Sequence, residues 1–267
     1  MSKSKWIKLI ILVIVFFFLW SSYIKWHVRY SIKQYLSERY GIKEDFTFIS
    51  YNNNWLEGID YQTMIELKNP YHSYLYFKTD RNSYEILQDQ SDDMYLGIFA
   101  GAYMEQHPKV ISFTKELIRK YGFIRYPNQY KPDDYFFPRD LIDINIDSKQ
   151  QKNLEKEFRK NLIINTTTLL PKLKPNNPPT RIADDIGVIN FTFTFDLSKT
   201  KHPVPKAEDI VTDFQKSRVL TTGIYNVKVH VFKSESFIGN DFDSIVSFRV
   251  DEKGTYTIIS RPNSDDL

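Results

Sequence analysis

The chain of 267 residues has no cysteine and only nine glycines. Without cysteine it cannot form disulfides, hold a metal through thiolates or carry a lipid on a cysteine side chain. With so few glycines it has no Gly-rich loop of the kind that cradles nucleotide phosphates. The formal net charge of +3 is too small to indicate a nucleic-acid partner. We therefore expect no cofactor and no nucleic acid.

Long hydrophobic runs are also scarce, with one exception near the amino terminus. Residues Leu9–Trp20 are apolar without interruption. About 20 apolar residues are needed to cross a bilayer, so this run is too short by itself. Aromatic residues flank it at Trp6, Tyr23 and Trp26, as is typical of the membrane interface, and each Leu, Ile, Val or Phe contributes about −0.3 to −0.6 kcal/mol to insertion. We predict a transmembrane segment at residues 9–26.

This segment is expected to remain attached as a signal anchor. Signal peptidase requires small residues after the apolar core, whereas Leu19–Tyr23 carries bulky side chains there. Basic residues occur on both sides of the segment and do not decide its orientation. A tail as short as residues 1–8 normally stays in the cytoplasm. We therefore predict a protein of the cell membrane whose larger, C-terminal part is extracytoplasmic.

The composition of that part favours strands and solid cores, because 20 Phe and 18 Tyr stand against the nine glycines. We place a first α+β unit at residues 27–125 and a second at residues 126–267, forming either two domains or one.

The first unit is expected to begin with a helix that leaves the membrane, ends at Tyr40 and is capped by Gly41. Three strands should follow, the last two as a hairpin: residues 46–51, 61–68 and 74–80. Two further helices, at residues 94–106 and 110–121, are separated by Pro108 and closed by Gly122. The first and the last of these three helices both end in Tyr-Gly. Two ordinary glycine caps explain this more simply than an internal repeat.

The second unit should open with a loop at residues 126–138 and a polar helix at residues 148–164. The apolar stripe of that helix is Leu154, Phe158, Leu162 and Ile163. A linker at residues 171–179 precedes a strand, residues 188–196, whose alternation predicts one core face and one solvent face. A helix at residues 205–219 and a three-stranded meander then complete the chain, the strands being residues 225–232, 244–250 and 255–260.

Segregated helices and neighbouring antiparallel strands predict an α+β fold in which a transmembrane helix precedes antiparallel sheets with packed helices. A leading helix on a curved antiparallel sheet resembles cystatin-like and NTF2-like domains. Residues Tyr35–Leu36, Tyr40–Gly41, Phe46–Tyr51 and Tyr74–Asp80 resemble small membrane-anchored proteins of Gram-positive bacteria, most of them uncharacterised. This likeness covers at most residues 26–93 and carries no functional residue over. The architecture is also similar to conjugation-channel subunits with NTF2-like domains behind one membrane helix.

Catalytic patterns are weak. Ser112 and Lys115 match the Ser-x-x-Lys motif of penicillin-interacting enzymes, but the partner motifs Ser-Asp-Asn and Lys-Thr-Gly are missing and such matches arise by chance. The five histidines lack metal-binding spacing, and His230 falls on the polar side of a strand. We predict no catalytic, cofactor-binding or metal-binding residue; the histidines are His27, His72, His107, His202 and His230.

Three loop segments are candidate sites. Asn240, Asp241 and Asp243 offer oxygen ligands for a hard cation such as calcium, although a solvated Asx turn explains them better. The pair Asp184–Asp185 is similar. Tyr135–Pro138 forms either an exposed contact patch or part of the core. Two glycosylation sequons, at Asn165 and Asn190, are interpreted as incidental.

These observations favour a single-pass membrane-anchored binding protein that interacts with a protein or an envelope component and is not an enzyme. Two other hypotheses remain open. A cell-envelope hydrolase with an unrecognised carboxylate site would gather Asp and Glu in one cleft. A subunit of a secretion or conjugation assembly would show an apolar patch or an open sheet edge.

Overall fold

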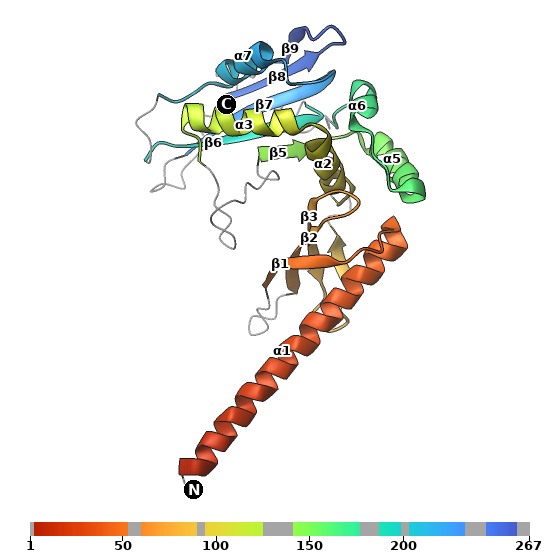
Figure 1. Ribbon diagram of the computed structural model, residues 1–267, viewed down its shortest axis with the longest axis vertical. Helices are drawn as coiled ribbons and strands as arrows, with labels where there is room; N and C mark the ends of the chain where they lie inside the picture. Colours follow the sequence, from red (N-terminus) through yellow and green to blue (C-terminus); the bar gives the residue numbers. More distant parts are fainter. Residues whose placement is uncertain are drawn as a thin grey trace.

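Helix α1 (Lys3–Tyr40) runs for 38 residues without a break and protrudes from two sheets (Figure 1). It has two different surfaces. Between Trp6 and Trp20 its apolar side chains are exposed. From Ile24 onward every fourth residue is buried in the core, the stripe being Ile24, Val28, Ile32, Leu36 and Tyr40. The expectation that the exit helix continues the apolar segment is confirmed, with Gly41 in the left-handed conformation after it.

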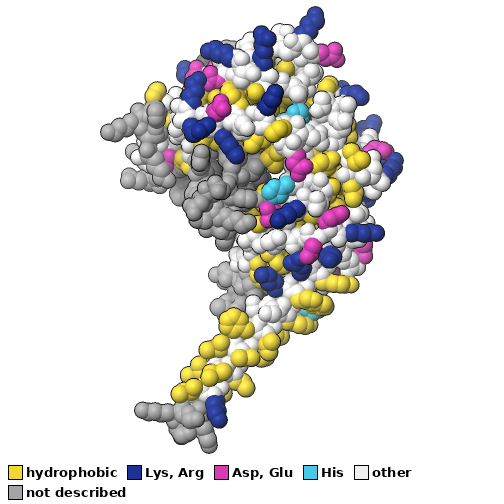
Figure 2. All heavy atoms as spheres, viewed as in Figure 1, with side chains coloured by type: hydrophobic (Ala, Val, Ile, Leu, Met, Phe, Trp, Pro, Cys, Tyr) yellow, Lys and Arg dark blue, Asp and Glu magenta, His cyan; other side chains and the backbone are white. Residues whose placement is uncertain are grey.

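The computed structural model describes residues 3–52, 60–89, 94–124, 141–176, 187–198, 203–232 and 244–260. Within these ranges, α1 is the helix long and apolar enough to span a membrane by length and composition. The hydrophobic side chains that cover its free half are visible in Figure 2.

The first sheet is an antiparallel meander in which each strand pairs with the next along the chain. Its order is β1-β2-β3-β4, and the expected hairpin of β2 and β3 is confirmed by a continuous register from Tyr61↔Thr79 to Leu67↔Ser73. The stripe of α1 lies on one face, where Tyr35 contacts Phe77 edge to face. Its strands are β1 (Phe46–Asn52), β2 (Tyr61–Leu67), β3 (Ser73–Thr79) and β4 (Ile86–Asp89).

Helix α2 (Met94–Gln106) lies between the two sheets and contacts both β3 and β5 (Ile142–Ile144). Gly101 permits the approach to β3, since a Cβ there would lie 2.4 Å from the Ser73 hydroxyl oxygen. After the break at His107, α3 (Pro108–Tyr121) runs over the second sheet and ends at Gly122, as expected. Phe123 stacks on Phe193 of that sheet at 4.9 Å.

The second sheet is mixed. Its order is β5-β6-β7-β8-β9, and β6 pairs with β7 in parallel. The α+β class is confirmed. The second sheet is mixed where an antiparallel sheet was expected, because β6, α7 and β7 form one crossover unit. The predicted meander of the last three strands is present. The elements are β6 (Ile189–Asp196), α7 (Ala207–Ser217), β7 (Gly223–Phe232), β8 (Ser244–Val250) and β9 (Tyr256–Ser260).

The polar helix is shorter than predicted. Helix α5 (Ser148–Asn161) ends where Leu162 adopts the left-handed conformation. The chain turns there, so Ile163 leaves the stripe and is 65% exposed, while Phe158 remains buried. A short helix, α6 (Thr166–Leu169), follows before the predicted linker. A 3₁₀ turn, η2 (Leu170–Lys172), overlaps the start of that linker.

The expectation of a wet face on residues 188–196 is also wrong. On the polar side of β6, Asn190 and Asp196 are 2% and 0% exposed. Polar side chains can be buried when hydrogen bonds replace those to water. Asp196 accepts such bonds from the backbone nitrogen and hydroxyl of Ser198, at 2.9 and 2.6 Å.

Candidate functional site

A groove between α3 and α7 is the candidate site. Both helices are amphipathic and lie side by side on the second sheet, where Phe113 of α3 meets Phe214 of α7 at 5.4 Å. Phe214 also packs on Phe191 of β6 at 5.0 Å, which fixes the contact between the two helices to the core. The helices bury one stripe each: Val110, Thr114, Leu117 and Ile118 in α3, and Ala207, Ile210, Val211 and Phe214 in α7.

The groove has a volume of about 310 Å³. This is near the lower end of the range of small-molecule sites, and it would also hold one or two side chains of a protein partner. Its walls combine an apolar floor with charges of both signs at the rim. The lining residues are Phe113, Glu116, Leu117, Lys120, Asp213, Lys216 and Ser217.

Asp213 is the electrostatic centre of the groove. Its carboxylate accepts hydrogen bonds from Lys120 Nζ at 2.5 Å and from the Tyr121 hydroxyl at 2.8 Å, so it ties α7 to the end of α3. The bond to Asp213 raises the pKa of Lys120. Burial, and then the bond to Asp213, raise the pKa of Tyr121. Both donors therefore stay protonated at neutral pH.

This arrangement suits binding. An apolar floor takes up a hydrophobic side chain, and the mixed rim selects among partners by charge. Lys216 and Glu116 take no part in the hydrogen bonds of Lys120 and Tyr121 to Asp213, and they lie on the rim of the groove. On the face shown in Figure 2, acidic and basic side chains alternate with hydrophobic ones over the upper part of the molecule.

A second polar cluster lies on the first sheet, on the face away from α1. Glu66 and Tyr74 are opposite each other in β2 and β3. His72 Nε2 is 2.8 Å from Glu66 Oε1 and 2.9 Å from the Tyr74 hydroxyl. The backbone nitrogen of His72 donates to Glu105 of α2 at 2.6 Å. The cluster thus joins the hairpin to α2 and brings a carboxylate, an imidazole and a phenol within hydrogen-bonding distance of one another.

The Ser-x-x-Lys pair Ser112 and Lys115 lies on the exposed side of α3. The Ser112 hydroxyl donates to the Pro108 carbonyl at 3.1 Å, a bond within the helix. Neither residue lines the groove. The structure therefore does not bring this pair into the candidate site.

The described histidines occupy four separate places. His27 of α1 stacks on Tyr84, and His72 belongs to the cluster with Glu66. His107 is buried at the α2–α3 junction, where Nε2 lies 3.0 Å from the Thr166 hydroxyl. His230 lies on the polar side of β7 and is half-buried. In the described ranges, no three His, Asp or Glu side chains gather as metal ligands.

Several candidate residues from the sequence analysis lie outside the described ranges: Asp184, Asp185, His202, Asn240, Asp241, Asp243 and the segment Tyr135–Pro138. Of the two sequons, Asn165 caps α6 by accepting from the Thr168 nitrogen. Asn190 is buried in mid-strand.

Sequence reasoning missed the groove. The amphipathic pattern of residues 110–121 and 205–219 indicated two surface helices. Such a pattern does not show which helices pack beside each other. The Glu66–Tyr74 pair had a usable signal, because a hairpin closed at residues 69–72 sets them opposite each other.

Comparisons with known proteins found no match for this chain among protein-family models, curated proteins or solved structures.

Proposed function

We propose that this protein is a single-pass membrane-anchored binding protein whose folded part is extracytoplasmic and engages a protein or another envelope component. The observation that carries the proposal is the continuity of α1. A membrane-length apolar surface leads directly into the stripe that begins at Ile24 and forms part of the core. The fold is therefore joined to its anchor without a flexible linker.

The groove is the proposed contact surface. Figure 1 shows α3 and α7 in the part of the molecule farthest from the amino terminus. A rigid anchor at one end and a mixed apolar and charged groove at the other suit a protein that presents a binding surface away from the bilayer.

Orientation is tested by single-cysteine labelling, which is clean because the chain has no cysteine. Lys253→Cys, in the exposed turn after β8, is compared with Ser4→Cys in the amino-terminal tail. A membrane-impermeant maleimide should label Lys253→Cys in intact cells and Ser4→Cys only after permeabilisation. The reverse pattern would contradict the orientation, and a mature chain beginning near Ser22 would contradict retention of the anchor.

Binding in the groove is tested with a photo-crosslinking amino acid placed in the full chain at Glu116 or at Lys115. The two positions are neighbours on α3, but Glu116 lines the groove and Lys115 does not. A discrete adduct should form in cells from position 116 and not from position 115, and Lys216→Glu on the opposite rim should weaken it. Equal adducts from both positions would contradict the groove.

Assembly with other subunits is a second candidate, favoured by strand β9. This strand is an edge of the second sheet, and Ile258 and Ile259 are 39% and 45% exposed. Exposed apolar edges are sites for strand pairing with another chain. A disulfide-trapped oligomer of Thr257→Cys in membranes would support assembly, whereas a monomer under oxidising conditions would favour the groove alone.

A further inference from the structure

The end of the first sheet that faces the membrane carries a rigid turn with an exposed arginine, and we propose that this arginine binds the phosphate-bearing headgroups of the bilayer that α1 crosses. The turn is the β3–β4 connection, residues 80–85, with Arg81 at its exposed tip. Lys25 of α1 precedes by two residues His27, which the turn contacts. The inference rests on the anchoring part of the proposed function and adds a lipid ligand to it.

The geometry of α1 sets the height of the sheet above the membrane. From Trp6 to Tyr23 the apolar side chains of the helix are exposed. At about 1.5 Å per residue this stretch is roughly 27 Å long, close to the ~30 Å hydrocarbon thickness of a bilayer. The next residue, Ile24, is only 2% exposed because the fold already covers it. The sheet therefore begins where the hydrocarbon ends, at the level of the headgroups.

An aromatic stack clamps the turn to α1 at this level. The ring of Tyr84, within the turn, stacks on the ring of His27 of α1, with 4.8 Å between the ring centroids. It also stacks on the ring of Tyr61 of β2, with 6.0 Å between the centroids. Its backbone has φ = +61°, a left-handed conformation that bulky residues rarely adopt. A conformation of this kind persists where the surroundings hold it in place. The turn is thus fixed against α1.

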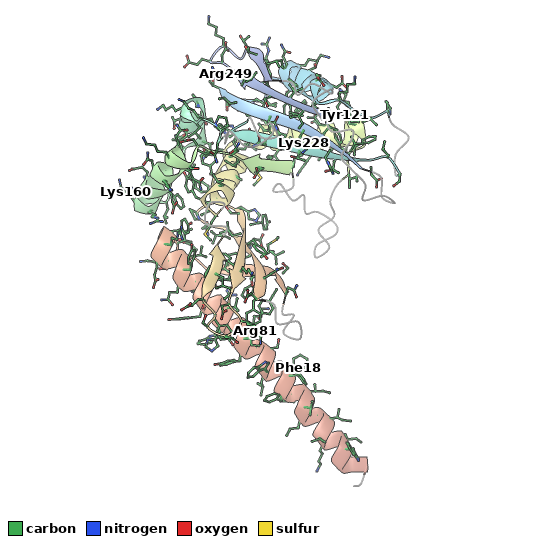
Figure 3. The ribbon with its side chains drawn as sticks, turned by 180° about the vertical axis from the view of Figure 1, so that it is seen from behind. Phe18, Arg81, Tyr121, Lys160, Lys228 and Arg249 are labelled. Atoms are coloured by element: carbon green, nitrogen blue, oxygen red, sulfur yellow. The ribbon has the colours of Figure 1, made fainter. Side chains whose placement is uncertain are left out.

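Asp80 is hydrogen-bonded within the turn, and Arg81 is exposed at its tip. Asp80 uses its carboxylate within the turn, accepting from the backbone nitrogens of Asn82 and Ser83 at 2.8 and 2.7 Å. Arg81 is exposed and has no ion-pair partner among the described residues. Glu85 is the exposed acidic residue of the turn. Figure 3 shows Arg81 at the end of the first sheet that is nearest Phe18 in the free half of α1.

The neighbouring basic residues divide into paired and unpaired ones. Arg29 is paired with Asp45 at 2.7 Å and Lys78 with Asp60 at 3.3 Å. Lys25, in contrast, lies over the ring of Phe48 at 5.3 Å and has its side chain exposed just beyond the apolar stretch. Lys25 and Arg81 therefore supply the positive charge available to lipid.

These groups match a lipid phosphate chemically. A guanidinium donates two parallel hydrogen bonds to phosphate oxygens. The exposed rings of Tyr23 and Trp26 belong to the type that settles at the headgroup level. A basic residue close to an anionic leaflet changes the contact equilibrium roughly fivefold. The lipid contact would hold the sheet against the surface and point the groove away from it.

Depth measurements on the full chain in vesicles test this inference. A nitroxide is attached to Asn82→Cys in the membrane-facing turn or to Lys253→Cys in the turn after β8. The two sites are matched, because each backbone nitrogen donates to the aspartate two residues earlier, Asp80 or Asp251, at 2.8 and 2.9 Å. In phosphatidylglycerol vesicles, the label at 82 should be shielded from a water-soluble relaxing agent, and the label at 253 should be fully accessible. Equal accessibility would overturn the inference.

The charge is tested by adding Arg81→Gln, which removes one positive charge, to the Asn82→Cys variant. Shielding of the label should fall roughly fivefold in phosphatidylglycerol vesicles and change little in phosphatidylcholine vesicles. An unchanged shielding in both would overturn the phosphate contact. Circular dichroism of each variant establishes that the fold is retained.

Vesicle flotation separates this inference from the anchoring proposal. If the chain floats with vesicles while both labels are equally wet, the lipid contact is wrong and the anchor stands. If the chain does not float, the anchoring proposal itself is wrong.

Discussion

The two sheets differ in how far the side chains on their more polar face are buried. The first is an antiparallel meander with α1 on one face, and on the other face Gln62, Met64 and Tyr76 are half-buried. The second has α3 and α7 on its apolar face, and part of its polar face is buried as well. There Asn190, Thr194, Asp196, Asn226 and Ser247 are all less than 7% exposed.

The difference shows that alternation of polar and apolar residues along a strand separates two faces by side-chain type. It does not show that the polar face is exposed to solvent. In the second sheet, polar side chains are buried because other groups replace water, as where the Ser247 hydroxyl donates to Asn226 Oδ1 at 3.0 Å. Asn190, opposite Asn226 in the parallel register, has no hydrogen-bond partner for its side-chain oxygen or nitrogen among the residues that the structure describes. The second sheet therefore contains both a satisfied and an unsatisfied buried amide.

The largest effect should come from a charge in the apolar layer of the second sheet. Phe193 is 1% exposed and stacks on Phe123. Phe193→Asp buries an unpaired carboxylate and removes an aromatic ring, which together cost at least about 3–5 kcal/mol, enough to unfold a marginally stable fold.

Thr192→Asp and Thr194→Asp are the controls on the other face. Thr192 is half-buried and Thr194 is 6% exposed, so the loss should increase in the order 192, 194, 193. Denaturant unfolding of the full chain in micelles gives the order. A smaller loss at Phe193 than at Thr192 would contradict the assigned faces.

The next effect separates the two halves of α1. Ile32→Ala creates a cavity in the first sheet's core, where Ile32 is 0% exposed, and should cost about 2–5 kcal/mol. Ile14→Ala is the matched change in the free half, where the side chain is 49% exposed, and should leave the unfolding midpoint of the sheets unchanged. Equal shifts in thermal melts in micelles would mean that the free half also packs on the fold.

Local patterns predicted much of this architecture. The stripe of α1, the β2–β3 hairpin and the glycine caps at Gly41 and Gly122 each depend on neighbours within a few residues, which the sequence states directly. The same applies to the meander of β7, β8 and β9.

Pairings between distant segments were not predicted. The parallel neighbour of β6 is β7, although α7 separates them, and the short edge strand β5 lies beside β6 across many intervening residues. The groove shares this cause, because Lys120 and Asp213 are 93 residues apart in the chain. The burial of Asn190 was missed since a polar residue in alternation is normally taken as solvent-facing.

A smaller effect sharpens the contrast between Asn190 and Asn226. Asn190→Leu removes a buried amide that has no partner in the described part of the chain, and it should stabilise the protein by about 1 kcal/mol. Asn226→Leu leaves the Ser247 hydroxyl without its acceptor and should cost about 1–3 kcal/mol. Opposite signs in denaturant unfolding are the expected result. A comparable loss in both variants would show that Asn190 has a partner, such as a bound water.

The smallest effect concerns the joint between the sheets. His107 lies at the α2–α3 junction beside Thr166, and burial lowers its pKa below 6.5. The unfolded chain therefore binds this proton more readily than the folded chain. The contribution of neutral His107 is fully present above pH 6.5 and declines as the pH falls from 6.5 through the folded pKa, with a slope of at most about 1.4 kcal/mol per pH unit. His107→Gln keeps a hydrogen-bonding group but does not titrate. The difference in unfolding free energy between wild type and variant should consequently shift against wild type on acidification, and a difference that is constant between pH 7 and pH 5 would place this histidine in contact with solvent.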